Sequence, residues 1–156
     1  MTNGLWVIDA SVLAKVYLKD EEFAPLAHEL VRRYVDGSVE LIAPQFIQYE
    51  IPSAIQAAVR RRRLNSSDAR QAIRDFFNLR IRTLGDADTL HLMIESAYWR
   101  ATQLGCRMYD ALYLVVAEVV KCQFITADSK LYEAIRDKVD YVVWIEDYAE
   151  SISDAT

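Results

Sequence analysis

The sequence predicts an α/β protein in which a parallel sheet is covered by helices on both faces. Short aliphatic or β-branched runs recur between longer stretches of helical pattern, which is typical of that class. With only 4 glycines and 3 prolines, the chain has no room for a long flexible linker. A length of 156 residues and a hydrophobic content of 53% suffice for one domain, 1–156, with a sizeable core.

Five short runs are the strand candidates, and the third is the weakest because it carries two arginines. They are LWVI (5–8), LIA (41–43), RIRTL (80–84), FIT (124–126) and YVVWI (141–145). Helical patterns fill the stretches between them, at 11–19, 24–35, 45–63, 67–79, 87–104, 109–121 and 129–138.

Local signals fix several helix ends. Pro25 lies where a missing N–H is harmless, NSSD (65–68) offers side-chain caps, and Gly105 follows the fifth helical stretch as a terminating glycine would. Pro52 falls inside the third helical stretch, where it removes one hydrogen bond. We therefore expect it to kink or split that helix.

Charge and cysteine content exclude several classes of protein. The net charge of −5 gives no global basic field of the kind that marks many nucleic-acid binders. Cys106 and Cys122 lack the spacing of a zinc finger or a disulfide framework, which favours a reducing compartment. The N-terminus has no signal-peptide pattern, and no apolar run is long enough to span a membrane. We expect a soluble, cytoplasmic protein with no membrane partner.

Acidic residues lie at strand ends and helix starts. Asp9 follows the first strand, Asp128 follows the fourth, and Asp110 opens the helix that precedes the fourth. Glu50 lies on the helix after the second strand. Ligands of open parallel sheets bind beyond the carboxyl ends of the strands, so these four acids are expected to converge there.

Four carboxylates in one place need a cation, because like charges cannot all stay ionised at close range. Carboxylate oxygens favour Mg²⁺ or Mn²⁺, which serve phosphoryl chemistry. Zinc is disfavoured, because His28 and His91 neighbour neither a cysteine nor the acids, and both are expected at the surface. The alternative is that the acids only cap helices and begin turns, with Ser11 capping the first helix.

Four segments, in this order, resemble the motif blocks of PIN-domain ribonucleases, and specifically VapC-type toxins of toxin–antitoxin pairs. They are VIDASVLAKVYLKDEE, APQFIQYEIPSAI, CRMYDALYLVVAE and FITADSKLYEAI. On this resemblance Asp9, Glu50, Asp110 and Asp128 match the family's catalytic metal ligands. Ser11 and Thr126 match the small hydroxyl residues that accompany the first and last acids and support them.

The resemblance implies a three-layer α/β/α sandwich with a parallel sheet of about five strands. It implies endoribonuclease activity dependent on Mg²⁺ or Mn²⁺, in which metal-activated water cleaves RNA to a 3′-hydroxyl and a 5′-phosphate. It also implies a homodimer and a cognate antitoxin, whose C-terminal segment would lie along the active-site groove of the toxin.

Arginines concentrate in the segment from 59 to 82. Eight arginines against Asp68 and Asp75 give a local charge of +6. The functional interpretation is a track for the RNA backbone, with Arg60, Arg63, Arg70 and Arg74 as candidates; the alternative is a solvated helical face.

Apolar residues have a packing interpretation. Leu112, Leu114, Val115 and Val119 are predicted in the core, and Trp6, Trp99 and Trp144 are interpreted as packing residues. An apolar excess would line a dimer contact.

Two rival functions stay open. A phosphatase or phosphoryl-receiver domain also places acids at strand ends, but a haloacid-type phosphatase needs an acid two residues after its nucleophile, where this chain has Ser11. A non-catalytic RNA- or partner-binding module would use its acids only as caps.

Overall fold

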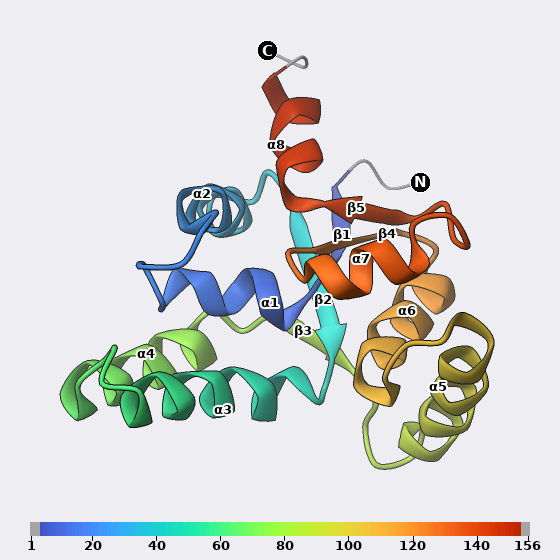
Figure 1. Cartoon of the computed structure of the whole chain (residues 1–156), viewed down its shortest axis with the longest axis horizontal. Coiled ribbons are helices and arrows are strands. Elements are labelled where there is room, and N and C mark those ends of the chain that lie inside the picture. The colour runs from blue at the N-terminus through green and yellow to red at the C-terminus, as the bar shows by residue number, and fades with distance from the viewer. Residues whose placement is uncertain (1–3, 154–156) are drawn as a thin grey trace.

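A five-stranded, wholly parallel sheet forms the centre of the molecule (Figure 1). The computed structural model describes residues 4–153. The strands are β1 (Leu5–Ile8), β2 (Glu40–Pro44), β3 (Arg82–Leu84), β4 (Gln123–Thr126) and β5 (Val142–Trp144). Their order across the sheet is β3-β2-β1-β4-β5. The predicted fold class is confirmed.

The central strand β1 is where the direction of winding reverses. Val7 pairs with Ile42 of β2 on one side and with Phe124 of β4 on the other. The chain first builds β2 and β3 outward from β1, and then crosses back to place β4 and β5 on the opposite side. Such a switch point opens a crevice beyond the carboxyl ends of the two strands that flank it, here β1 and β4.

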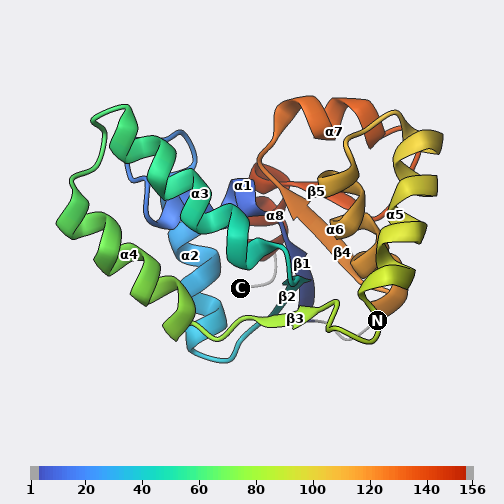
Figure 2. The same ribbon diagram turned by 90° about the horizontal axis from the view of Figure 1, so that it is seen from below.

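Helices cover both faces of the sheet (Figure 2). On one side lie α1 (Ala10–Leu13) with a 3₁₀ turn η1 (Ala14–Val16), α2 (Ala24–Val35), α3 (Ile47–Arg60) and α4 (Ser66–Asn78). On the other side lie α5 (Leu90–Leu104) and α6 (Met108–Val120), and α6 packs against β1, β2 and β4. Two short helices, α7 (Ser129–Ile135) and α8 (Ile145–Ser153), follow β4 and β5.

Every predicted strand and helix is present, with shifted ends. The expected helix over 11–19 is a short helix and a 3₁₀ turn that end at Val16, and the one over 129–138 ends at Ile135. Helix α8 was not predicted. It begins at Ile145, the residue at which the predicted strand was to end, and its Tyr148 ring packs edge-on against Trp6 with ring centroids 4.9 Å apart.

Pro52 does not split the third helix, although a split is one of the two outcomes that the sequence led us to expect. Helix α3 runs through Pro52 without a break. The reason is packing: Ile47, Ile51 and Ile55 are fully buried along one face of α3, and their burial outweighs the hydrogen bond that proline cannot make.

The core predictions on α6 hold for three of four residues. Leu112, Leu114 and Val115 are buried, but Val119 is 66% exposed because the continuous burial of α6 ends at Ala117. Trp99 is also not a packing residue: its side chain is 59% exposed on α5.

Trp6 and Trp144 pack as expected, against Tyr148 and Phe23 respectively. His28 and His91 are exposed, as predicted. Among the helices of residues 4–153, none is both long and apolar enough to cross a membrane.

Candidate acidic active site

The four predicted acids converge at the switch point of the sheet. Asp9 directly follows β1, Asp128 follows Ala127 after β4, and Glu50 and Asp110 lie in the first turns of α3 and α6. Glu50, Asp110, Asp128 and Ser11 line one open pocket of about 740 Å³. Asp9, which is 5% exposed, lies behind Ser11 and accepts its hydrogen bond.

Two hydroxyl groups fix the buried Asp9 carboxylate. Ser11 Oγ and Thr126 Oγ1 both donate to Asp9 Oδ2, at 2.7 and 2.6 Å. Each hydroxyl in turn accepts a backbone N–H from the turn after β4: Ala127 N–H reaches Ser11 Oγ, and Asp128 N–H reaches Thr126 Oγ1, both at 3.0 Å. The ends of β1 and β4 are therefore joined by two parallel relays that leave Asp9 one fixed orientation.

Burial and mutual repulsion raise the pKa values of two acids of the site. Burial raises the pKa of Asp9 to about 6. The hydrogen bonds from Thr126 and Ser11 lower it, and the nearby charges of Asp110 and Asp128 raise it by smaller amounts. Burial raises the pKa of Glu50 to about 7, assisted by the charges of Asp9 and Asp110. Both groups favour a bound cation over bare ionisation.

A residue of α6 orients the side chain of Glu50. Tyr113, 1% exposed, donates its hydroxyl to Glu50 Oε2 at 3.2 Å. The carboxylate lies on the pocket wall despite Pro52 two residues further along α3. The helix therefore brings Glu50 to the pocket that Asp110 and Asp128 also line.

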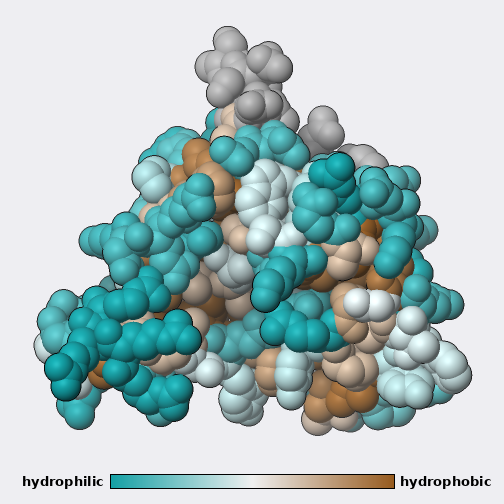
Figure 3. Space-filling model, in the orientation of Figure 1, coloured by the Kyte–Doolittle hydropathy of each residue, from teal (hydrophilic) through white to brown (hydrophobic). Residues whose placement is uncertain are grey.

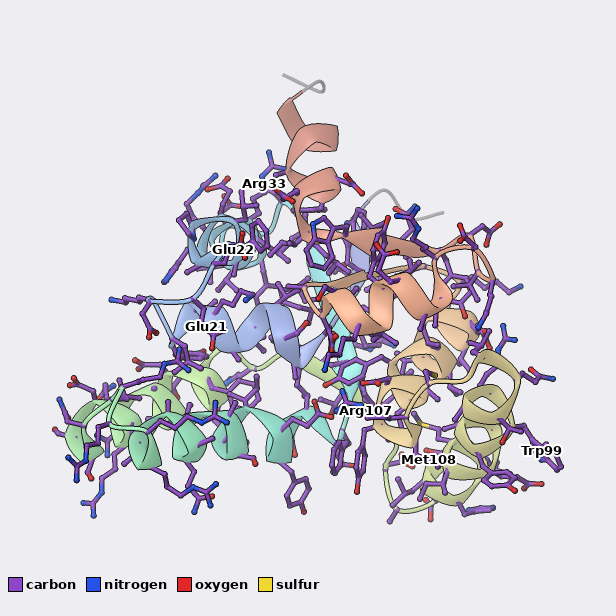
Figure 4. All side chains as sticks on the ribbon, viewed as in Figure 1. Glu21, Glu22, Arg33, Trp99, Arg107 and Met108 are labelled. Carbon is purple, nitrogen blue, oxygen red and sulfur yellow. The ribbon has the colours of Figure 1, made fainter. Side chains whose placement is uncertain are left out.

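Sequence reasoning missed two positively charged side chains that line this pocket, Arg107 and Lys15, the latter paired with Glu21 at 3.3 Å. Arg107 donates to both oxygens of Asp110, at 2.9 and 3.1 Å, and its Nη2 lies 3.5 Å from Asp128 Oδ2. Figure 4 shows Arg107 between the starts of α3 and α6. A local signal existed, because Arg107 and Asp110 are three residues apart, a spacing that brings side chains together on a helix.

The capping alternative applies to one acid of the four. Asp128 caps α7, with its Oδ1 accepting the N–H groups of Lys130 and Leu131 at 3.0 and 3.1 Å, while its other oxygen faces Arg107. Asp110 instead pairs with the guanidinium of Arg107, which is itself the residue at the N-cap of α6. Capping accounts for one oxygen of Asp128 and does not account for Asp110.

The chemistry of the donor set fits a hard divalent cation. Carboxylates from α3, α6, the N-cap of α7 and the loop before α2 line the pocket, where Lys15 and Arg107 already bring positive charge. Within residues 4–149, however, no three Asp, Glu, His or Cys side chains are arranged so that they could hold a metal as they stand. Both oxygens of Asp110 are bonded to Arg107 instead.

The candidate RNA-binding arginines lie on α3, α4 and the turn between them. Arg60 is exposed one turn beyond Ala57, which lines the acidic pocket, so α3 leads from the acids toward it. Arg70 and Arg74 are exposed on α4. Figure 3 shows this end of the molecule as a strongly hydrophilic surface.

Arg63 differs from the other three arginines. Its guanidinium makes two 2.8 Å hydrogen bonds to Asp20 and one of 3.1 Å to Glu21. It thereby ties the turn after α3 to the loop before α2, and much of its charge is already neutralised there.

Comparison with known proteins gives a consistent set of relatives. The family model described as "PIN domain" matches residues 6–136. The chain is 25% identical over 127 residues to ribonuclease VapC9 of Mycobacterium tuberculosis and to VapC ribonuclease Mb0985 of Mycobacterium bovis, covering 80% of this chain and 87% of each relative. It is 26% identical over 131 residues to ribonuclease VapC3 of Pyrobaculum aerophilum, covering 81% and 92%.

A solved structure has the same fold. The crystal structure of PAE2754 from Pyrobaculum aerophilum superposes with a TM-score of 0.69, covering 98% of both chains at 19% sequence identity. At that identity the likeness establishes the common architecture alone.

Proposed function

Because this chain belongs to the PIN-domain family and is distantly related to VapC ribonucleases, we propose that it is a metal-dependent endoribonuclease. The match of residues 6–136 to the PIN-domain model confirms the family that the four motif blocks indicate. The observation that carries the proposal is the convergence of Asp9, Glu50, Asp110 and Asp128 at the crevice between β1 and β4.

In this proposal the four acids hold Mg²⁺ or Mn²⁺. A divalent cation bound there supplies Lewis-acid chemistry and lowers the pKa of a water molecule so that it can attack the phosphodiester. Ser11 and Thr126 keep Asp9 in one orientation, and Tyr113 does the same for Glu50. A bound cation would favour the ionised forms of Asp9 and Glu50, whose pKa values burial raises. Cleavage leaves a 3′-hydroxyl and a 5′-phosphate.

In this proposal Arg107 has two positions for its side chain: bound to Asp110 and Asp128, or turned away from them. Its side chain is 72% exposed, so it is long and unhindered enough to leave Asp110 and Asp128 for solvent or for a substrate phosphate. Asp110 and Asp128 then become available to the cation. Arg60, Arg70 and Arg74 would contact the RNA backbone further along, and Arg63 would contribute only after leaving Asp20.

We further propose that the enzyme is the toxin of a type II toxin–antitoxin pair, on the strength of its VapC relatives and the motif resemblance. The implied partners are RNA, a cognate antitoxin and a second copy of the chain. Exposed apolar side chains on α5 support a protein contact there, among them Leu92, Ile94 and Trp99. Light scattering of the purified protein reports the oligomeric state.

The experiment is RNA cleavage by the purified protein with Mn²⁺ and with EDTA. Asp110→Asn should abolish cleavage while keeping the fold, and Asp137→Asn, at an exposed acid on another surface, should leave both unchanged. Calorimetry should show Mn²⁺ binding that disappears in Asp9→Asn. An Asp110→Asn protein that melts at a much lower temperature but cleaves normally per folded molecule would mean a structural acid.

The two rival functions give different results. RNA binding that is indifferent to EDTA and unaccompanied by cleavage indicates a non-catalytic binding module. A covalent phosphoryl group on Asp9 indicates a phosphatase or receiver domain.

A further inference from the structure

Three aromatic rings lie at the mouth of the acidic pocket. Phe46, at the start of α3, stacks on Tyr109 of α6 with ring centroids 4.5 Å apart and planes 3° from parallel. Tyr49 packs on Phe46 with centroids 6.1 Å apart and planes 28° from parallel. All three residues line the pocket that Glu50 and Asp110 also line.

The two tyrosines are unusually open to solvent for aromatic side chains. Tyr49 is 70% exposed and Tyr109 is 56% exposed, whereas Phe46 is partly buried and packs against the small core between α5 and α6. Phe46 therefore anchors the group, and the tyrosines carry its free ring surface. Exposed apolar surface concentrated beside a polar pocket marks a binding site.

Each tyrosine directly precedes a candidate metal ligand. Tyr49 stands before Glu50, and Tyr109 before Asp110. Adjacent Cα atoms are about 3.8 Å apart, and successive side chains on a helix diverge by about 100°. The acid of each pair reaches into the pocket while its tyrosine stands at the rim, within the span of one nucleotide.

We propose that Phe46, Tyr49 and Tyr109 form a base-stacking platform that receives an unpaired nucleobase next to the scissile phosphate. This inference rests on the proposed ribonuclease function and adds the residues that would position a base of the substrate beside the acids. The base extends the Phe46–Tyr109 column on the free side of Tyr109, and its phosphate lies at the acids, where Arg107 is also at hand.

Stacking determines which nucleobases the platform can bind. Every base has a π-face, so the rings bind bases without identifying them, and sequence preference must come from elsewhere. In a duplex both faces of a base are already occupied, so a base must be unpaired or extruded before it can reach Tyr109. The enzyme should therefore cut loops and single strands and spare continuous double helices.

The test combines two variants with two substrates. A short single-stranded RNA and its duplex are cleaved with Mn²⁺, and each nucleotide flanking the mapped cut is replaced in turn by an abasic one. Tyr109→Ala should raise the KM for the single strand about tenfold, while Tyr109→Phe, which keeps the ring, should behave like the wild type. Val35→Ala removes an exposed apolar side chain on α2 that does not line the pocket, and should change nothing.

The abasic substrates separate stacking from a structural role. At one flanking position, the abasic substitution should weaken cleavage by the wild type about tenfold. It should not weaken cleavage by Tyr109→Ala any further, because the ring and the base act through one contact. Equal losses in both proteins, or equal cleavage of single strand and duplex, overturn the platform. So does a Tyr109→Ala protein that cuts RNA normally but no longer binds a protein partner. A wild type that cuts no RNA at all refutes the ribonuclease proposal itself.

Discussion

Arg107 holds the carboxylate of Asp110 in a two-pronged ion pair, with both oxygens bonded at 2.9 and 3.1 Å. The same guanidinium reaches Asp128, on the far side of the pocket, at 3.5 Å. A positive side chain thus bridges two of the acids that the proposed function assigns to a cation. The guanidinium and the metal compete for the same oxygens.

Arg107→Ala should therefore tighten Mn²⁺ binding. An exposed ion pair is worth up to about 1 kcal/mol, so the Kd measured by calorimetry should fall about two- to fivefold. Arg32→Ala is a matched control, because Arg32 makes a similar two-pronged pair with Glu29 on α2, at 2.8 and 2.7 Å. Weaker Mn²⁺ binding in Arg107→Ala would show that the arginine assists loading.

Thr126 is expected to matter through its hydroxyl alone. It is fully buried, donates to Asp9 and accepts from the Asp128 backbone. Thr126→Val keeps the shape, removes one of the two hydroxyl bonds to Asp9 and leaves the Asp128 N–H without its acceptor, so the free energy of unfolding should fall by about 1–3 kcal/mol and cleavage should drop. Thr126→Ser restores the hydroxyl and should recover most of both. Denaturant unfolding and initial rates measure them; a Thr126→Val protein equal to wild type in both would refute the relay.

The stability of the metal-free protein should depend on pH between 5 and 8. The folded pKa values of Asp9 and Glu50, about 6 and about 7, lie above the ordinary values of 3.8 and 4.5. The folded state therefore binds more protons than the unfolded state, and stability is lost as pH rises through that range. The acids whose pKa is lowered, such as Asp36 and Asp86, titrate below it.

Thermal melts in EDTA should show this loss as a Tm about 5–10 °C lower at pH 8 than at pH 5. Asp9→Asn should reduce the dependence and leave the part due to Glu50, and saturating Mn²⁺ should restore the wild-type Tm at pH 8. A wild-type Tm that is constant or rises over this range would contradict the raised pKa values of both acids.

Hydrophobic runs and helical periods predicted the sheet and most helices because burial against a parallel sheet imposes them. They do not tell which side of a helix meets its neighbours: α5 packs mainly on α6 rather than on the sheet, and Val119 and Trp99 are exposed. Helix α8 was missed because its first residue closes an apolar run and Glu146 and Asp147 follow immediately. The local sequence at this point does not distinguish the end of a strand from the start of a helix.

The positions of the acids were predictable because strand ends share an edge of the sheet. Their partners were not, since those depend on which side chains arrive from elsewhere. Arg107 meets Asp128 from 21 residues away, and Arg63 meets Asp20 across 43. The run of four arginines at 60–63 looked uniform in the sequence, and only the fold distinguishes Arg63 from Arg60.

Pro52 provides the last test, because α3 passes through it unbroken. A proline inside a helix costs about 3 kcal/mol relative to alanine, less where neighbouring packing adapts. Pro52→Ala returns the N–H that bonds the preceding turn, so the free energy of unfolding should rise by about 1–2 kcal/mol. Glu50 is held by Tyr113 across the pocket, so cleavage should stay within about twofold of wild type. Chemical denaturation and initial rates on the same samples measure both. Pro52→Ala that is more stable yet loses cleavage would mean that the proline, rather than Tyr113, aims Glu50 at the cation.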